Sequence, residues 1–129
     1  MSYYFSKILG NASFEGAVSK VTEELKKEGF GVLTDIDVKS TLKKKLDVDF
    51  KQYRILGACN PPFAYQALQA EDKIGLMLPC NVIVQETSEG KIEVAIIDPV
   101  ASMQAVGNPD LGKIADQVRN KLKTVVQNL

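Results

Sequence analysis

Histidine and tryptophan are both absent from this chain of 129 residues. Histidine is the usual general base and a common metal ligand, so its absence excludes Ser-His-Asp and Cys-His catalysis. The remaining reactive groups are carboxylates, lysines, tyrosines and two thiols, and the carboxylates form no spaced acid/base pair. Phosphate-binding and dinucleotide-binding motifs are absent as well. The sequence therefore favours a protein that is not an enzyme, with thiol chemistry as the one open route.

An excess of charge of either sign is also missing, because 16 lysines and arginines balance 16 aspartates and glutamates. Nucleic-acid binding depends on a basic surface that neutralises phosphates, so we expect no nucleic-acid partner. No apolar run approaches the roughly 20 residues of a membrane helix, and the first residues do not form a signal peptide. We therefore expect a cytoplasmic protein without a membrane partner, in which the two cysteines are free thiols.

Length and composition are those of one globular domain, which we expect to cover residues 1–129. Hydrophobic residues make up 45% and charged residues 25% of the chain, as is ordinary for a protein with one buried core. A chain of this size buries enough surface to fold without disulfides or structural metals.

Apolar periodicity and turn residues predict an alternation of strands and helices. The strands are predicted at residues 3–9, 30–38, 53–59 and 92–97, with two further strand-like stretches at 74–78 and 81–86 on either side of Pro79. The helices are predicted at residues 14–28, 40–46, 61–70 and 109–129, with one or two further helical turns at 100–106. Asn60 and Asn108 each precede a proline, and we expect both to cap the helix that follows.

Two of these elements carry expectations about burial. In residues 30–38 apolar and polar side chains alternate, which is typical of a strand with one buried face. In residues 40–46 we expect Leu42 and Leu46 to face the interior, while the lysines beside them face water. Acidic residues follow this lysine cluster, so we interpret it as a solvated helix face rather than a phosphate site.

The order of elements predicts an α+β fold of two layers, with an antiparallel sheet of about five strands crossed by helices on one face. An apolar stripe runs from Leu111 to Leu129, as expected for a long C-terminal helix that lies across the sheet. The other face of the sheet is then open. Its strands are more apolar than one covered face explains, so we expect a homodimer.

The two cysteines stand in a repeated pair, Cys59-Asn60 and Cys80-Asn81. If strand 53–59 pairs with strand 81–86, the two thiols become cross-strand neighbours, with Cβ atoms about 5 Å apart. Such a pair can act as a redox dithiol, bind Zn²⁺ or Cu⁺ as two soft ligands, or supply a nucleophile. The alternative is that both cysteines are small buried residues and that the asparagines have local structural roles.

Three motifs resemble the signature of a bacterial and archaeal family, the domain of unknown function 302: Ile55-Leu56-Gly57-Ala58-Cys59-Asn60-Pro61, Ala64-Tyr65 with Ala67-Leu68, and Leu76 with Leu78-Pro79-Cys80-Asn81-Val82. The segments 29–38 and 107–109 are similar to the family pattern too. The resemblance implies a fold similar to the TATA-binding-protein class, a curved antiparallel sheet crossed by helices. It implies no established activity. Relatives by fold include DNA binders and proteins that hold an apolar ligand between the sheet and a long helix.

Two functional hypotheses follow. The first is a metal-binding or redox-active dithiol protein, with Cys59, Asn60, Cys80 and Asn81 as site residues and Zn or Cu as the metal. The alternative is a non-enzymatic binding module that holds a small apolar ligand or a protein partner, on the sheet or under the C-terminal helix. The apolar-ligand hypothesis requires a cavity under the helix at residues 111–129.

Overall fold

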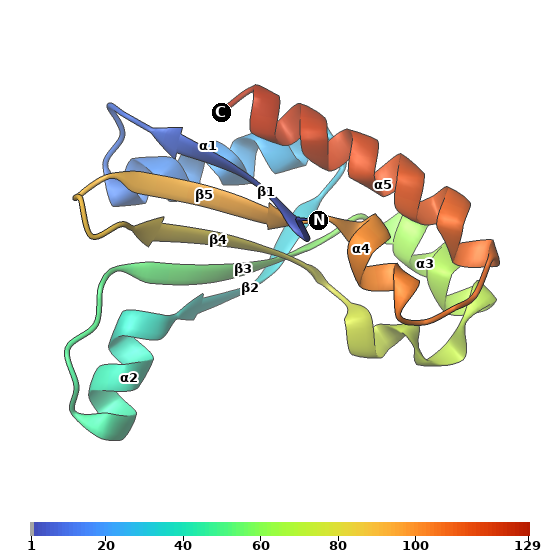
Figure 1. Ribbon diagram of the computed structural model, residues 1–129, viewed down its shortest axis with the longest axis horizontal. Coiled ribbons are helices and arrows are strands. Elements are labelled where there is room, and N and C mark those ends of the chain that lie inside the picture. The colour runs from blue at the N-terminus through green and yellow to red at the C-terminus, as the bar shows by residue number, and fades with distance from the viewer. Residues whose placement is uncertain (1) are drawn as a thin grey trace.

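The computed structural model describes residues 2–129 and consists of an antiparallel sheet with helices across one face (Figure 1). The strands are β1 (Tyr4–Leu9), β2 (Gly31–Asp37), β3 (Tyr53–Cys59), β4 (Cys80–Glu86) and β5 (Ile92–Ile97), in the spatial order β1-β5-β4-β3-β2. The helices are α1 (Phe14–Lys27), α2 (Val38–Leu46), α3 (Pro61–Ala70), the 3₁₀ helix η1 (Asp72–Met77), α4 (Pro99–Gln104) and α5 (Asp110–Gln127). The predicted α+β fold with a long C-terminal helix is confirmed.

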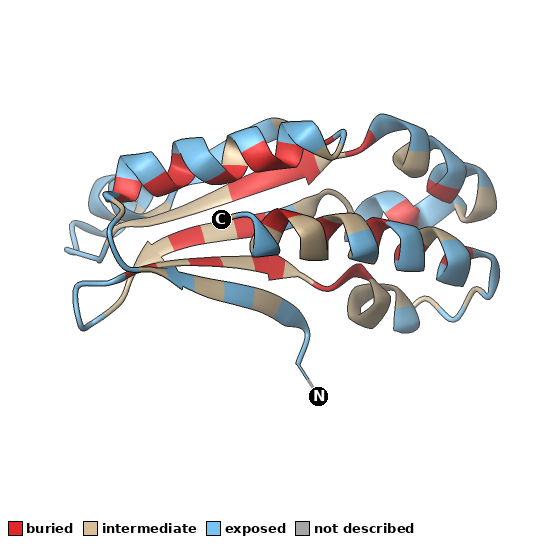
Figure 2. Cartoon of the chain, turned by 90° about the horizontal axis from the view of Figure 1, so that it is seen from above, coloured by how far each residue is buried: buried red, intermediate tan, exposed pale blue. Residues whose placement is uncertain are grey.

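Two amphipathic helices, α1 and α5, cover one face of the sheet (Figure 2). The Gly16 N–H donates to Ser13 Oγ at 3.0 Å and caps α1, and Gly29 has the left-handed φ of 87° with which helices commonly end. The buried faces of both helices meet the even-numbered residues of β3, β4 and β5. These residues include Leu56, Val82, Val84, Val94 and Ile96. The core therefore lies between the helices and the middle strands.

The burial predicted for residues 30–38 is wrong beyond the first residues of the segment. Of the predicted buried stripe, Phe30 is buried, but Thr34 is exposed and Ile36 is 48% exposed. A register shift between Val32 and Thr34 in the pairing of β2 with β3 moves the later residues to the opposite face, and β2 is also an edge strand. The alternating pattern indicated a strand correctly, but periodicity reveals neither a bulge nor an edge position.

The burial predicted for the short helix is also wrong. Helix α2 begins directly after β2 and lies on the side of the sheet away from α1 and α5 (Figure 1). None of its residues is buried; Leu42 is half-buried and Leu46 is 66% exposed. The contacts of α2 are mainly with β2 and β3 at the edge of the sheet, and its apolar residues stay near solvent.

Residues 74–78 do not form the predicted strand. Most of this segment belongs to η1, where Ile74 is fully buried beside Ala67 and Leu111, while Leu76 is 84% exposed. A short apolar run does not distinguish a strand from a helical turn by periodicity alone. The strand predicted after Pro79, at residues 81–86, does form, and β4 begins one residue earlier at Cys80.

The remaining local predictions agree with the structure in most respects. A turn at 87–91 joins β4 to β5, with Gly90 at a φ of 77°. Asn108 Oδ1 accepts from the Asp110 N–H at 2.9 Å and so caps the first turn of α5. No helix within residues 2–129 combines the length and apolar character needed to cross a bilayer.

Candidate ligand-binding cavity

A cavity of about 300 Å³ lies at the end of the sheet where β3 ends and β4 begins. Helices α3, α4 and the first half of α5 form one wall, through residues such as Phe63, Met103 and Ile114. The ends of β3 and β4 form the other wall, through Ala58 and Cys80. Of the described residues that line the cavity, none is charged. The cavity lies where the apolar-ligand hypothesis places it, under the C-terminal helix.

Small side chains explain why this end of the molecule is hollow. Ala58, Ala67 and Ala115 are buried, with at most 5% of their surface exposed, and all three line the cavity. Protein interiors are normally filled to the density of organic crystals. At these positions a methyl group faces the space that a leucine or phenylalanine fills elsewhere in the core.

Because Gly57 has no side chain, two residues that line the cavity, Thr34 and Pro79, can lie close to its backbone. A Cβ atom on Gly57 would lie 2.2 Å from Thr34 Oγ1 and 2.7 Å from Pro79 Cγ. Both distances are well inside van der Waals contact, so any side chain at this position would displace Thr34 and Pro79. The glycine is therefore required for the shape of the cavity.

Strands β3 and β4 pair as predicted, but their register does not place the two cysteines opposite each other. Ala58 is the partner of Cys80, and Cys59 falls one residue past this pair. Both cysteines are free thiols and are not within disulfide distance. The predicted direct pairing of the thiols is therefore wrong by one residue, because pairing of two strands does not specify their register. Both thiols nevertheless line the cavity.

The environment of Cys80 favours a neutral thiol. Burial, and then the neighbouring Cys59, raise the pKa of the Cys80 thiol to about 11. The thiolate is the form that attacks electrophiles and binds metals. Within residues 2–129 no group of three or more histidines, cysteines, aspartates or glutamates is arranged to hold a metal ion.

The two asparagines of the repeated pairs have different surroundings. Asn60 is 8% exposed and lines the cavity, and its Nδ2 donates to the carbonyl of Glu28 at 3.2 Å. Its side chain does not cap α3, contrary to expectation. Asn81 is exposed and belongs to a groove on the open face of the sheet. The structure therefore brings Cys59, Asn60 and Cys80 to one cavity and leaves Asn81 outside it.

Several cavity residues were not identified from the sequence, among them Ala58, Ala64, Ala67, Met103 and Ala115. Alanines carry little periodic signal because they suit a core, a helix surface and a cavity wall equally well. The apolar stripe of α5 did contain a signal, since Leu111, Ile114 and Val118 belong both to the stripe and to the cavity wall.

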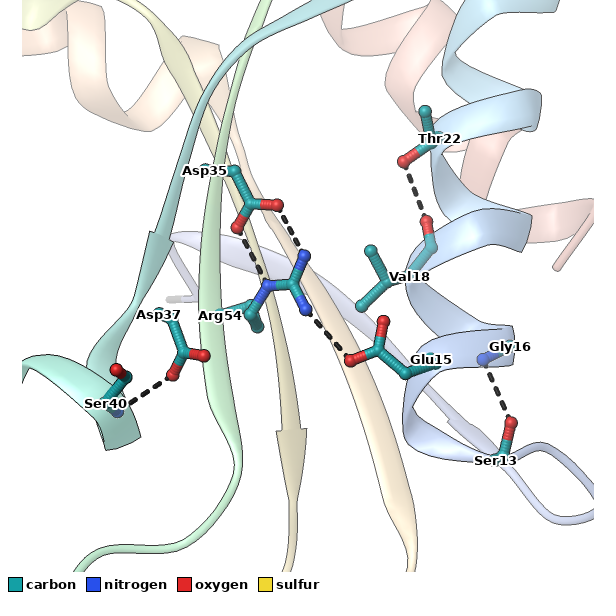
Figure 3. A network of polar contacts seen from close by, with 9 residues as sticks. All are labelled: Ser13, Glu15, Gly16, Val18, Thr22, Asp35, Asp37, Ser40 and Arg54. Atoms are coloured by element: carbon teal, nitrogen blue, oxygen red, sulfur yellow. Dashed lines mark hydrogen bonds and ion pairs between the residues drawn. The ribbon is translucent and has the colours of Figure 1, made fainter.

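The main polar network lies away from the cavity and joins α1 to the edge of the sheet (Figure 3). Arg54 donates through Nε to Asp35 Oδ1 at 2.8 Å, through Nη2 to Asp35 Oδ2, and through Nη1 to Glu15 Oε1 at 3.0 Å. The hydrogen bond from Arg54 lowers the pKa of Asp35, and partial burial opposes this effect. These contacts satisfy the guanidinium and fasten β2 and β3 to α1, so we interpret the network as structural.

Comparison with known proteins identifies a family. The family model described as "Domain of unknown function DUF302" matches residues 5–129. A crystal structure of an uncharacterized conserved DUF302 protein from Bacillus stearothermophilus matches with a TM-score of 0.91 at 26% sequence identity, over 99% of this chain and 98% of that one. No curated protein matches the chain. The resemblance seen in the cysteine-asparagine motifs is confirmed, and with it the fold.

Proposed function

This chain belongs to the DUF302 family, and we propose that it is a non-enzymatic binding module that holds a small apolar molecule in the cavity beneath α5. The observation that carries the proposal is the cavity of about 300 Å³ whose described lining has no charged side chain. Ligand pockets are mostly apolar, with a few polar groups that orient the ligand. Thr34, Cys59, Asn60 and Cys80 supply such groups here.

The volume of the cavity sets the size of the ligand. An engineered apolar cavity of about 150 Å³ holds benzene. A cavity twice as large accepts roughly a dozen non-hydrogen atoms, the size of a bicyclic aromatic or a short branched hydrocarbon. At about 0.5 kcal/mol per atom, between the limits of about 0.3 and 1.5, the free energy of binding is about −6 kcal/mol. We therefore expect a dissociation constant of tens of micromolar for a ligand of about twelve such atoms, and of about 0.5 mM for a bicyclic aromatic of about nine such atoms.

The test is a titration with benzothiophene, an uncharged bicyclic aromatic. Binding is monitored by calorimetry and by chemical-shift changes in the protein. Saturable binding is expected for the wild type. Ala115→Leu should reduce binding at least tenfold, because the added side chain enters the cavity from α5. Gln117→Leu is the matched control, since Gln117 is an exposed residue of the same helix that does not line the cavity. Absence of binding up to the solubility limit, or binding unaffected by Ala115→Leu, would contradict the proposal.

A dithiol function through Cys59 and Cys80 is the second candidate, favoured by the presence of both thiols on one cavity wall. The raised pKa of Cys80 weighs against it, because a redox dithiol or a Zn or Cu site uses the thiolate. Metal content and free-thiol counts of the wild type, Cys59→Ser and Cys80→Ser separate the two candidates. Stoichiometric metal or a readily formed disulfide in the wild type alone would favour the dithiol function.

We also propose that a second copy of the chain covers the open face of the sheet. Direct strand pairing aligns Ile36, Ile55, Ile83 and Ala95 in one row across four strands. The row belongs to the open face, because Ile83 and Ala95 line the groove there together with Tyr3 and Tyr4. Tyr3 is 65% exposed and Tyr4 is 42% exposed.

The size of this face suits a small symmetric interface. Five strands about 4.8 Å apart, each rising about 3.3 Å per residue over about six residues, present at most about 480 Å² per copy, because α2 lies on the same side next to β2 and β3. Two faces together bury at most about 1,000 Å², which is at the lower limit for a specific interface. Net charge of zero adds no repulsion between copies.

Sedimentation as a function of concentration tests the homodimer. Ile83→Glu places a charge in the centre of the row and should shift the protein to a monomer. Gln117→Glu, on the exposed side of α5, should leave the dimer intact. A wild-type protein that is monomeric at all concentrations up to about 0.5 mM, far above the dissociation constant of a stable dimer, would refute this proposal.

A further inference from the structure

The side chain of Asn60 does not cap the helix that follows it, although asparagine is a common N-cap residue. An N-cap asparagine accepts a hydrogen bond from the N–H of the second or third helical residue. Here Pro61 and Pro62 occupy the first two positions of α3 and have no N–H, and the Asn60 side chain makes no capping bond. The N–H of the third helical residue, Phe63, remains, but the Asn60 side chain makes no bond to it, so the amide oxygen has no local donor.

The orientation of the Asn60 amide is set by its other partner. Nδ2 donates to the carbonyl of Glu28 at 3.2 Å. Rotation of the amide by half a turn would place Oδ1 against this carbonyl, two acceptors in contact, so only the observed assignment is consistent. Among residues 2–129 no group donates a hydrogen bond to Oδ1. Because Oδ1 is not completely enclosed, it keeps accessible surface at which a hydrogen-bond donor can reach it.

Asn60 is also 92% removed from solvent, as follows from its exposed fraction of 8%, and it lines the cavity. The other polar side chains on the described wall are Thr34, which is exposed at the end of the sheet, and the two thiols. A charged ligand would lose its hydration in this cavity and gain no opposite charge. A neutral ligand with a single donor would instead satisfy the one strong acceptor on the wall.

We propose that Asn60 Oδ1 accepts a hydrogen bond from the ligand, which is an uncharged apolar molecule with one N–H or O–H group. This inference rests on the proposed function and narrows it to one chemical class. Asn60 then determines specificity through a single contact, while the apolar wall supplies most of the affinity.

Indole and benzothiophene test the inference, because they have nearly the same size and shape but only indole has an N–H donor. A neutral hydrogen bond contributes about 1 kcal/mol net, so indole should bind the wild type about fivefold more tightly. Asn60→Leu should remove this preference, because the variant has no acceptor at this position.

Asn81→Leu is the control from the other cysteine-asparagine pair and should retain the full preference, because Asn81 lies outside the cavity. Equal affinity of the wild type for both ligands would overturn the inference and leave the proposed function intact. This comparison needs no variant, so it holds even if a substitution of Asn60 prevents folding. Failure of both ligands to bind would instead overturn the proposed function.

Discussion

The molecule has two apolar regions under its helices, and only one of them is filled. The main core packs α1 and the second half of α5 on the middle strands, with branched residues such as Leu56, Val94 and Leu122. At the other end of the sheet, the first half of α5 faces α3 and α4 across a cavity of about 300 Å³. The two regions are equally apolar, so apolar character alone does not separate a core from a binding site; the size of the side chains does.

Truncation of one leucine in each region should give the largest difference between the regions in free energy of unfolding. Leu122 is fully buried in the main core, so Leu122→Ala should lower the free energy of unfolding by about 4 kcal/mol. Leu111 is also buried but borders the cavity, where its contacts are one-sided, and Leu111→Ala should cost about 2 kcal/mol. Urea unfolding measures both values. Equal losses would show that the cavity end is packed as tightly as the core.

The pH dependence of stability tests the boundary between the regions, where Cys80 lies. The pKa of its thiol is raised from 9.0 to about 11 in the folded protein, by burial first and by Cys59 second. Below pH 9 the thiol is protonated in both states and stability is unaffected. Above pH 9 the unfolded state releases the proton first, so stability should fall by about 2 kcal/mol in total by pH 11.

Comparison with Cys80→Ser isolates this contribution, because other groups also titrate at high pH. The variant should lose less stability than the wild type between pH 9 and 11, whereas Cys59→Ser should retain most of the wild-type dependence. Identical profiles for the wild type and Cys80→Ser would mean that the Cys80 thiol is open to solvent, as a reactive site would be.

Two glycine substitutions test how the cavity is closed. Gly57→Ala should destabilise the protein by about 2 kcal/mol, because the new Cβ would meet Thr34 Oγ1 at 2.2 Å and Pro79 Cγ at 2.7 Å. Gly31→Ala is the matched control in the neighbouring strand, since nothing lies within 4 Å of its Cβ position. Its stability should stay within about 0.5 kcal/mol of the wild type. Thermal unfolding of the two variants under the same conditions makes the comparison.

Filling the cavity should give the smallest effect and the opposite sign. Ala115→Leu places new methyl groups in empty space and should raise the free energy of unfolding by about 1 kcal/mol. The same change at Ala17, which is fully buried in the main core, should instead destabilise the protein through overpacking. If Ala115→Leu destabilises as much as Ala17→Leu, the space beneath α5 is already occupied in solution.

The candidate site was predicted only in part from the sequence. The repeated cysteine-asparagine pairs pointed to the correct end of the sheet, since Cys59, Asn60 and Cys80 all line the cavity. Asn81 was misplaced because it follows Cys80 directly in β4, and successive side chains of a strand point to opposite faces of the sheet. The role of Asn60 was also missed. Whether an asparagine caps a helix or bonds to a distant carbonyl depends on a partner 32 residues away in the chain.

The sequence by itself determined the five strands, the helices α1 and α5, and the layered antiparallel fold, because apolar periodicity, caps and turn residues are local properties; residues 74–78 are the exception, since their short apolar run was interpreted as a strand. Only the tertiary structure decided that β2 lies at an edge, that α2 stands apart from the core, and that α5 covers a filled region and a hollow one. The volume of a cavity is the difference between the volume that several elements enclose and the volume of the side chains that point into it. No single segment specifies that difference, so it arises only when α3, α4 and α5 come together at the end of the sheet.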